Sequence, residues 1–212
     1  MKKLFCIPYA GGASTVFNGL KDAIDTCKIE IIPLELKGRG TRSKEKFYSS
    51  FNEAVQDLVI LIENKIDKNE EISLLGYSLG SLIAYEVVKR LEEKGYICKN
   101  LIIMANNAPN ISVKELLDEN DDGELMRFVK NLGMFNEKKF YDARFLNIYI
   151  KIIREDFKIL KDYRKSTHNK KVYANLTVMY GNEDYLHQNA ESWRGYTRNK
   201  FQIYSLSHAA SY

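Results

Sequence analysis

The chain has 212 residues, of which 45% are hydrophobic and 28% are charged. This balance is ordinary for a globular protein and excludes a disordered or fibrous chain, and the length fits one domain with a sizeable core. The net charge of +4 comes from basic residues that are scattered among acidic ones. No basic stripe with interleaved aromatic residues is present, so we expect no nucleic-acid partner.

The cysteines and the apolar runs indicate where the protein acts. Cys6, Cys27 and Cys98 are odd in number and lack the spacing of metal ligands, so they predict reduced thiols in a cytoplasmic protein. The apolar run near the N-terminus is too short for a signal peptide, and no run approaches the length of a membrane span. We therefore expect neither a membrane partner nor a metal or other cofactor.

Strand-like and helix-like segments alternate over the first half of the chain. Short apolar runs predict strands at 4–7, 29–36, 72–75 and 101–104, and helices are expected at 14–26, 51–62 and 79–94. Ser50 and Glu53 form a capping-box signal before the second helix, and Gly95 is well placed to end the third. This order is typical of an α/β fold with a mostly parallel, doubly wound sheet.

The pattern changes after the fourth predicted strand. Residues 110–172 contain no convincing strand and indicate several helices, the best of which repeats apolar residues along 145–160. Strands resume at 176–180 and 201–204. We therefore predict a single domain over 1–212, with a helical lid at about 110–172 that is inserted before the last two strands.

A candidate nucleophile lies between the third predicted strand and the third predicted helix. Gly76-Tyr77-Ser78-Leu79-Gly80 is a G-x-S-x-G motif, and a strand before it with a helix after it is the context that an α/β-hydrolase nucleophile requires. We expect a sharp turn to expose the Ser78 hydroxyl and Leu79 to donate one oxyanion N–H. The loop after the first strand is rich in glycine, and the N–H of Tyr9 or Ala10 is expected to be the second donor.

Three histidines are candidates for the general base. In this fold the order is serine, acid, histidine, with the base after the last strand, and His208 fits this position. His168 lies in a charged stretch that is typical of a solvated surface. His187 follows the best acid candidate by only three residues, and it is kept as a weaker alternative.

The candidate acid is Asp184, which follows a predicted strand directly. A carboxylate at that end of the strand faces the same edge of the sheet as the serine and is expected to orient the imidazole. Glu183 is a rival. Related hydrolases can place the acid after the preceding strand, but residues 104–109 contain no carboxylate.

These motifs together resemble the type II thioesterases of nonribosomal peptide and polyketide assembly lines. The resemblance covers nearly the whole chain, and it includes the stretches around the catalytic candidates and the lid landmarks 131–133 and 152–157. It implies a substrate that is an acyl or aminoacyl thioester on the phosphopantetheine arm of an acyl or peptidyl carrier protein, which the enzyme removes in a housekeeping role. We further expect a monomeric enzyme, and the mechanism implies no metal or redox cofactor.

Four departures from the family pattern stand out. Tyr77 replaces the usual histidine before the nucleophile, and Lys37 replaces a proline. The residues around His208 differ from the family's glycine and aromatics, and the chain stops at Tyr212 without the usual C-terminal helix. We expect Tyr77 to change packing rather than chemistry and His208 to be held loosely. A carboxylesterase, an acyltransferase and a non-catalytic carrier-binding module stay open as alternatives.

Overall fold

The computed structural model describes residues 1–25, 27–111, 118, 120–131, 143–164, 170–181 and 185–206. Side chains are described for these residues except 128–131, 143, 145, 164 and 185–188. Six strands form one sheet in the order β2-β1-β3-β4-β5-β6, and every neighbouring pair is parallel. Their bounds are β1 Lys2–Ile7, β2 Ile29–Pro33, β3 Glu71–Tyr77, β4 Ile97–Met104, β5 Asn175–Gly181 and β6 Phe201–Leu206.

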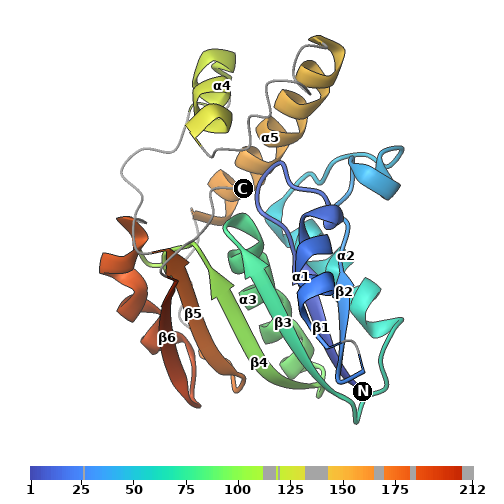
Figure 1. Ribbon diagram of the computed structural model, residues 1–212, viewed down its shortest axis with the longest axis vertical. Coiled ribbons are helices and arrows are strands. Elements are labelled where there is room, and N and C mark those ends of the chain that lie inside the picture. Colours follow the sequence, from blue (N-terminus) through green and yellow to red (C-terminus); the bar gives the residue numbers. More distant parts are fainter. Residues whose placement is uncertain are drawn as a thin grey trace.

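Helices cover both faces of this sheet (Figure 1). They are α1 (Asn18–Ala23), α2 (Phe51–Glu63), α3 (Leu79–Glu93), α4 (Asp122–Asn131) and α5 (Ala143–Arg164). The described residues also include the 3₁₀ segments η1 (Ser14–Phe17), η2 (Gly40–Arg42) and η4 (Tyr185–Tyr196). The predicted α/β fold is confirmed. None of the helices in the described residues has the length and hydropathy that a bilayer span requires.

The two faces of the sheet carry cores of unequal size. Along β1, Phe5 and Ile7 join the large core with α2, α3 and η4, whereas Leu4 and Cys6 join a small core beneath η1 and α1. This alternation follows from the period of two in a strand. Burial raises the pKa of the Cys6 thiol to about 12, which keeps it protonated and inert.

The ends of several elements differ from the sequence prediction. β2 ends at Pro33 rather than at Leu36, because Leu34 and Leu36 leave the sheet and enter the large core. β4 begins at Ile97 rather than at Leu101, because the exposed Lys99 interrupts the apolar run from which the strand was predicted. The predicted helix over 14–26 is a 3₁₀ turn followed by a short α-helix that ends at Ala23.

The caps of α2 and α3 largely match their sequence signals. The Ser50 hydroxyl accepts the Glu53 N–H at 3.1 Å, but the Glu53 carboxylate accepts from the N–H and hydroxyl of Ser49 rather than from Ser50. Gly95 has a φ of 85° and ends α3 with the paired backbone bonds of a Schellman motif.

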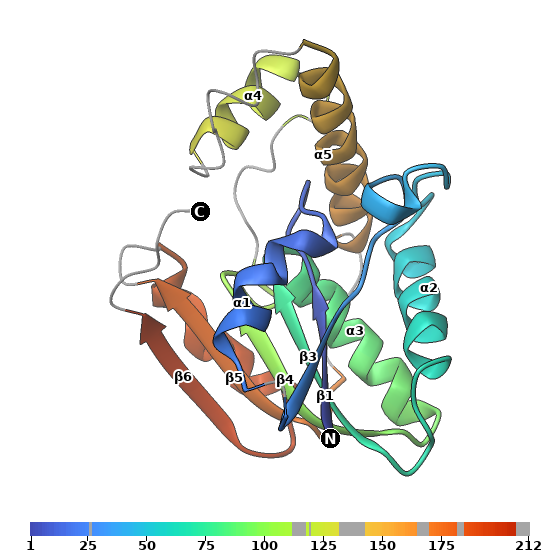
Figure 2. The ribbon, with the colours of Figure 1, turned by 45° about the vertical axis from the view of Figure 1, so that its right-hand side comes forward.

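The helices α4 and α5 lie beyond the carboxyl end of the sheet (Figure 2). The C-terminal half of α5 is anchored to the body of the protein, because the Tyr163 ring stacks on Phe51 of α2 at a centroid distance of 4.1 Å. The Tyr163 hydroxyl also donates to Glu86 of α3 at 3.0 Å. Ile153 and Phe157 of α5 are buried, as the apolar repeat predicted. This placement brings α5 next to the loops that leave β1 and β2, because Asp156 of α5 bonds to Gly11 and to Arg39.

Candidate active site

Ser78 occupies a strained turn between β3 and α3. Its φ of 52° and ψ of −117° lie outside the regions that non-glycine residues usually adopt, and such a conformation costs about 1–3 kcal/mol. The strain is maintained by neighbouring hydrogen bonds. The Ser78 N–H donates to the Met104 carbonyl at 2.8 Å, and the Asn106 side-chain amide donates to the Ser78 carbonyl at 2.7 Å.

The two glycines of the motif are required by close backbone contacts. A Cβ atom on Gly76 would lie 2.2 Å from the Gly80 carbonyl oxygen, and one on Gly80 would lie 2.2 Å from the Ile7 carbonyl oxygen. Real Cβ atoms do not approach backbone this closely, and backbone has little freedom to move away. The glycines therefore allow the turn at Ser78 to pack directly against the end of β1.

Ser81 supports the same turn from within α3. Its buried hydroxyl lies 2.7 Å from the Gly76 carbonyl oxygen and 2.9 Å from that of Met104, and it accepts the Met104 N–H at 3.2 Å. The ends of β3 and β4 are thus held together beneath the serine. Because β1 and β3 are neighbours whose following connections leave in opposite directions, this position is the topological switch point where α/β sheets bind ligands.

The glycine-rich loop after β1 forms a tight turn beside Ser78. The Gly12 N–H donates to the Tyr9 carbonyl at 2.9 Å, and Gly11, the third residue of the turn, has a φ of 84° that favours glycine. The Tyr9 ring packs edge to face on Tyr77 at 5.1 Å. Burial, with a further contribution from Tyr77, raises the pKa of Tyr9 to about 12. This contact gives Tyr77 a packing role, as expected from the sequence.

Some backbone N–H groups of the turn after β1 and of the start of α3 form hydrogen bonds within the protein, and others do not. Gly11 and Gly12 use theirs, because Gly11 donates to the Asp156 carboxylate at 2.7 Å and Gly12 closes the turn. Within the described residues, no hydrogen bond uses the N–H of Tyr9, Ala10 or Leu79. Leu79 begins α3, where the backbone N–H groups and the helix dipole favour negative charge.

A buried ion pair lies behind this turn. Arg39, from the loop after β2, donates to both carboxylate oxygens of Asp156 on α5, at 2.6 and 2.5 Å. Burial disfavours the charged guanidinium, but Asp156 outweighs it and raises the pKa of Arg39, which therefore stays protonated. Arg39 also donates to the Gly12 carbonyl at 3.3 Å. Three segments that are distant in the sequence meet at this pair.

The comparisons with known proteins agree with this geometry. The model of the thioesterase domain family matches residues 2–209. The chain belongs to the thioesterase domain family. The gramicidin S biosynthesis protein GrsT of Aneurinibacillus migulanus is 26% identical over 205 residues, which are 95% of this chain and 78% of GrsT. Thioesterase PikA5 of Streptomyces venezuelae is 24% identical over 209 residues, or 97% of this chain and 73% of PikA5.

A solved structure shares the fold of this thioesterase. The RedJ thioesterase from the prodiginine pathway of Streptomyces coelicolor superposes with a TM-score of 0.86 at 23% identity, over 98% of this chain and 77% of RedJ. The predicted resemblance to type II thioesterases of nonribosomal peptide and polyketide synthesis, with an α/β-hydrolase fold, is thereby confirmed. The chain is a thioester hydrolase.

The predicted acid and base of the thioesterase, Asp184 and His208, lie outside the described residues, as do the rivals Glu183 and His168 and the side chain of His187. The strands that lead to the acid and the base are described. β5 ends at Gly181, three residues before Asp184, and β6 ends at Leu206, two residues before His208, and these two strand ends are paired with each other. The chain therefore reaches both positions from the carboxyl edge of the sheet, where Ser78 lies.

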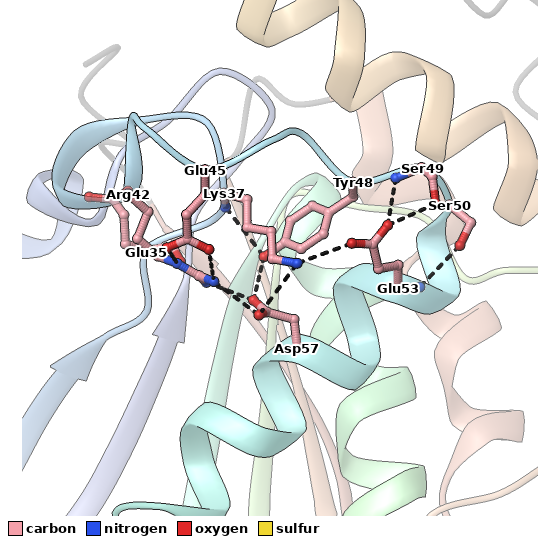
Figure 3. Close-up of polar contacts among 9 residues, drawn as sticks. All are labelled: Glu35, Lys37, Arg42, Glu45, Tyr48, Ser49, Ser50, Glu53 and Asp57. Carbon is pink, nitrogen blue, oxygen red and sulfur yellow. Dashed lines mark hydrogen bonds and ion pairs between the residues drawn. The ribbon is translucent and has the colours of Figure 1, made fainter.

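A second polar network of the thioesterase lies farther along the loop after β2 (Figure 3). Arg42 forms a two-pronged pair with Asp57 of α2 at 2.6 and 2.9 Å, and the Tyr48 hydroxyl donates to Asp57 at 2.7 Å. Lys37 contacts Glu53 at 3.0 Å. Burial raises the pKa of Tyr48, as does its bond to Asp57. Lys37, the departure from the family's proline, thus ties this loop to α2.

Sequence reasoning missed two supporting roles in this thioesterase. Asn106, in the stretch searched only for a carboxylate, holds the Ser78 carbonyl, and Trp193 in turn donates to the Asn106 carbonyl at 2.9 Å. Asp156 was noted only as part of a family landmark, and its contact with the glycine-rich turn had no local signal. In the described part of the chain, no cluster of three His, Cys, Asp or Glu side chains could hold a metal ion.

Proposed function

We propose that Ser78, Asp184 and His208 form a catalytic triad that hydrolyses acyl or aminoacyl thioesters on the phosphopantetheine arm of a carrier protein. The observation that carries this proposal is the strained turn at Ser78, which is held by Met104, Asn106 and the two close glycine contacts. A fold retains such strain where the hydroxyl must project above the sheet.

The reaction follows from these roles in two steps. His208 takes the proton from the Ser78 hydroxyl as its oxygen attacks the thioester carbonyl carbon, and Asp184 orients the imidazole. The tetrahedral intermediate collapses, the carbon–sulfur bond breaks, and the pantetheine thiolate receives the proton from His208. A water molecule, deprotonated by His208, then attacks the acyl-serine ester. The bond between the acyl carbon and the serine oxygen breaks, His208 returns the proton to that oxygen, and the carboxylic acid is released.

The oxyanion of both intermediates would accept hydrogen bonds from the N–H of Leu79 and from the N–H of Tyr9 or Ala10. Two facts support this assignment: these N–H groups are unused within the described residues, and the turn and the start of α3 adjoin the end of β1. One such donor is typically worth about 3 kcal/mol of activation free energy.

The carrier-protein substrate is supported by relatives that are named for biosynthetic pathways. GrsT is named for gramicidin S biosynthesis, and the RedJ structure comes from prodiginine biosynthesis. By this analogy we extend the proposal to an editing role in a comparable pathway, with an acyl or peptidyl carrier protein as the partner. The cytoplasmic location predicted from the cysteines is part of the same proposal.

The decisive experiment follows hydrolysis of a panel of acylated carrier proteins by mass spectrometry. Ser78→Ala should lower turnover by about 10⁴-fold or more, because no other group supplies the nucleophile. The exposed Ser43→Ala is the matched control and should retain full activity. Retained turnover in Ser78→Ala would refute the proposed site. Transfer of the acyl group to an alcohol or amine would indicate an acyltransferase instead, and faster hydrolysis of simple oxygen esters would indicate a carboxylesterase.

A further inference from the structure

The Asp156 carboxylate does more than neutralise Arg39. Its Oδ2 atom accepts both an Arg39 N–H at 2.6 Å and the backbone N–H of Gly11 at 2.7 Å. Arg39 in turn donates to the carbonyl of Gly12. The pair therefore binds the glycine-rich turn at the Gly11 N–H and at the Gly12 carbonyl.

The packing of α5 reinforces these hydrogen bonds. Tyr149, Ile153 and Asp156 lie at i, i+4 and i+7 on one face of α5, and this face meets the turn. A Cβ atom at Gly11 would lie 2.7 Å from Ile153 Cγ1 and 3.2 Å from the Tyr149 hydroxyl. The turn is thus in close contact with α5, and Gly11 is required by both its φ and its surroundings.

Stability alone is a poor explanation for a pair of this kind. Both side chains are only 2% exposed, and removing two charges from water offsets most of their mutual attraction. Among the described residues, the buried Nε of Arg39 also finds no hydrogen-bond acceptor. Apolar side chains of similar volume would often stabilise the packing of this loop on α5 equally well. They could not, however, form hydrogen bonds that orient a peptide group.

We propose that Arg39 and Asp156 are positioning residues, which fix the Tyr9–Gly12 turn on α5 so that its unused N–H groups point at the reacting oxygen. The inference rests on the proposed function, because it takes Ser78 as the nucleophile and Tyr9 or Ala10 as an oxyanion donor. It assigns to α5 a part in building the oxyanion hole. Removing the pair should then affect the transition state more than substrate binding.

The test replaces the pair by apolar residues and compares it with a matched pair from the same loop. The test variant is Arg39→Met with Asp156→Leu, and the control is Arg42→Met with Asp57→Leu. The measurements are kcat and KM for an acyl-pantetheine thioester, and the inhibition constant of an alkyl trifluoromethyl ketone. That ketone forms a hemiketal with serine whose oxyanion occupies the same hole. Circular dichroism and urea unfolding verify that each variant folds.

The test variant should lose about 10²-fold in kcat, the loss expected when one oxyanion donor is misplaced, with KM changed by less than about threefold. Binding of the ketone should weaken in proportion to kcat/KM. The control variant should keep kcat and the inhibition constant of the ketone within about threefold of the values for the unmodified enzyme. Arg39→Lys preserves the charge but loses the two-pronged geometry of the guanidinium, so it should also lower kcat. This single variant replaces the double variant in the test if the double variant does not fold.

The contrary outcomes are distinct. If the folded test variant keeps kcat, or loses kcat without weaker binding of the ketone, the positioning role is refuted. Ser78→Ala, measured in parallel, tests the proposed function separately. An inactive Ser78→Ala beside a fully active Arg39/Asp156 variant refutes positioning alone, whereas an active Ser78→Ala refutes the site itself.

Discussion

Two arginines of the loop after β2 each pair with an aspartate of a different helix, and the two pairs differ in their exposure to solvent. Arg39 reaches Asp156 on α5, and Arg42, three residues later, reaches Asp57 on α2, both with two-pronged geometry. The side chains of the inner pair are 2% exposed, whereas those of the outer pair are 15% and 17% exposed. The hydrogen-bond distances of the two pairs are similar, so the pairs differ mainly in their exposure to solvent.

This difference predicts different consequences for the two networks. The outer pair also contacts Lys37, Glu45 and Tyr48 (Figure 3). Because this pair is partly exposed, water can compensate for a lost partner. The inner pair is shielded from water, and without Asp156 the Arg39 guanidinium would lose its strongest partner while staying buried. We therefore expect the inner pair to respond strongly to single substitutions and the outer pair to respond weakly.

The largest expected effect is that of Asp156→Ala. It leaves the Arg39 guanidinium buried and unpaired and removes the acceptor of the Gly11 N–H, so the free energy of unfolding should fall by about 3–5 kcal/mol. Urea unfolding at neutral pH measures this loss. Asp156→Leu should lose a similar amount of stability, and adding Arg39→Met to Asp156→Leu should recover most of that loss. A loss no greater than that of the outer pair would show that burial does not distinguish the two networks.

A smaller effect is expected for Asp57→Asn in the outer pair. Burial favours the neutral acid, but hydrogen bonds from Arg42 and Tyr48 outweigh it and lower the pKa of Asp57. The substitution should lower the free energy of unfolding by about 1–2 kcal/mol, the value of a charged hydrogen bond discounted for exposure. In about 1 M NaCl this difference should narrow because of screening, whereas that of Asp156→Ala should not. Equal salt dependence of both variants would contradict the comparison.

The order of strands and helices and the position of the turn at Ser78 could be predicted from the sequence. Both depend on local patterns, since apolar periodicity sets the elements and G-x-S-x-G between a strand and a helix sets the turn. The Ser50 cap of α2 was predictable for the same reason. The C-terminal end of β2 and the start of β4 could not be predicted. Leu34 is apolar but packs in the large core beyond the strand, and Lys99 is charged but lies within the strand.

The polar contacts behind the site could not be predicted, because they join distant parts of the chain. Arg39 and Asp156 are 117 residues apart, and Asn106 reaches Ser78 across 28 residues. No spacing rule connects such positions, and each side chain alone is typical of a solvated surface. Only the sheet order and the path of α5 bring them together. The same limit applies to the acid and the base, whose assignment rests on chain order and family resemblance.

The smallest expected effect is the pH dependence that Glu53 adds to the outer network. The N–H and hydroxyl of Ser49, with Lys37, lower the pKa of Glu53 to about 2, from an ordinary value near 4.3. A lowered folded-state pKa stabilises the protein above the ordinary value, and this contribution is lost as the pH falls from about 4.3 towards 2. Glu53→Gln should therefore be less stable than the unmodified protein at neutral pH, and the difference should vanish across that range. Urea unfolding at a series of pH values measures this change. The control is Glu45→Gln. The exposed Glu45 carboxylate contacts Arg42, and its substitution should leave the unfolding midpoint unchanged at neutral pH. If Glu45→Gln instead matched Glu53→Gln at every pH, the Ser49 contacts would add nothing beyond exposed charge, and the outer network would act only through screened electrostatics.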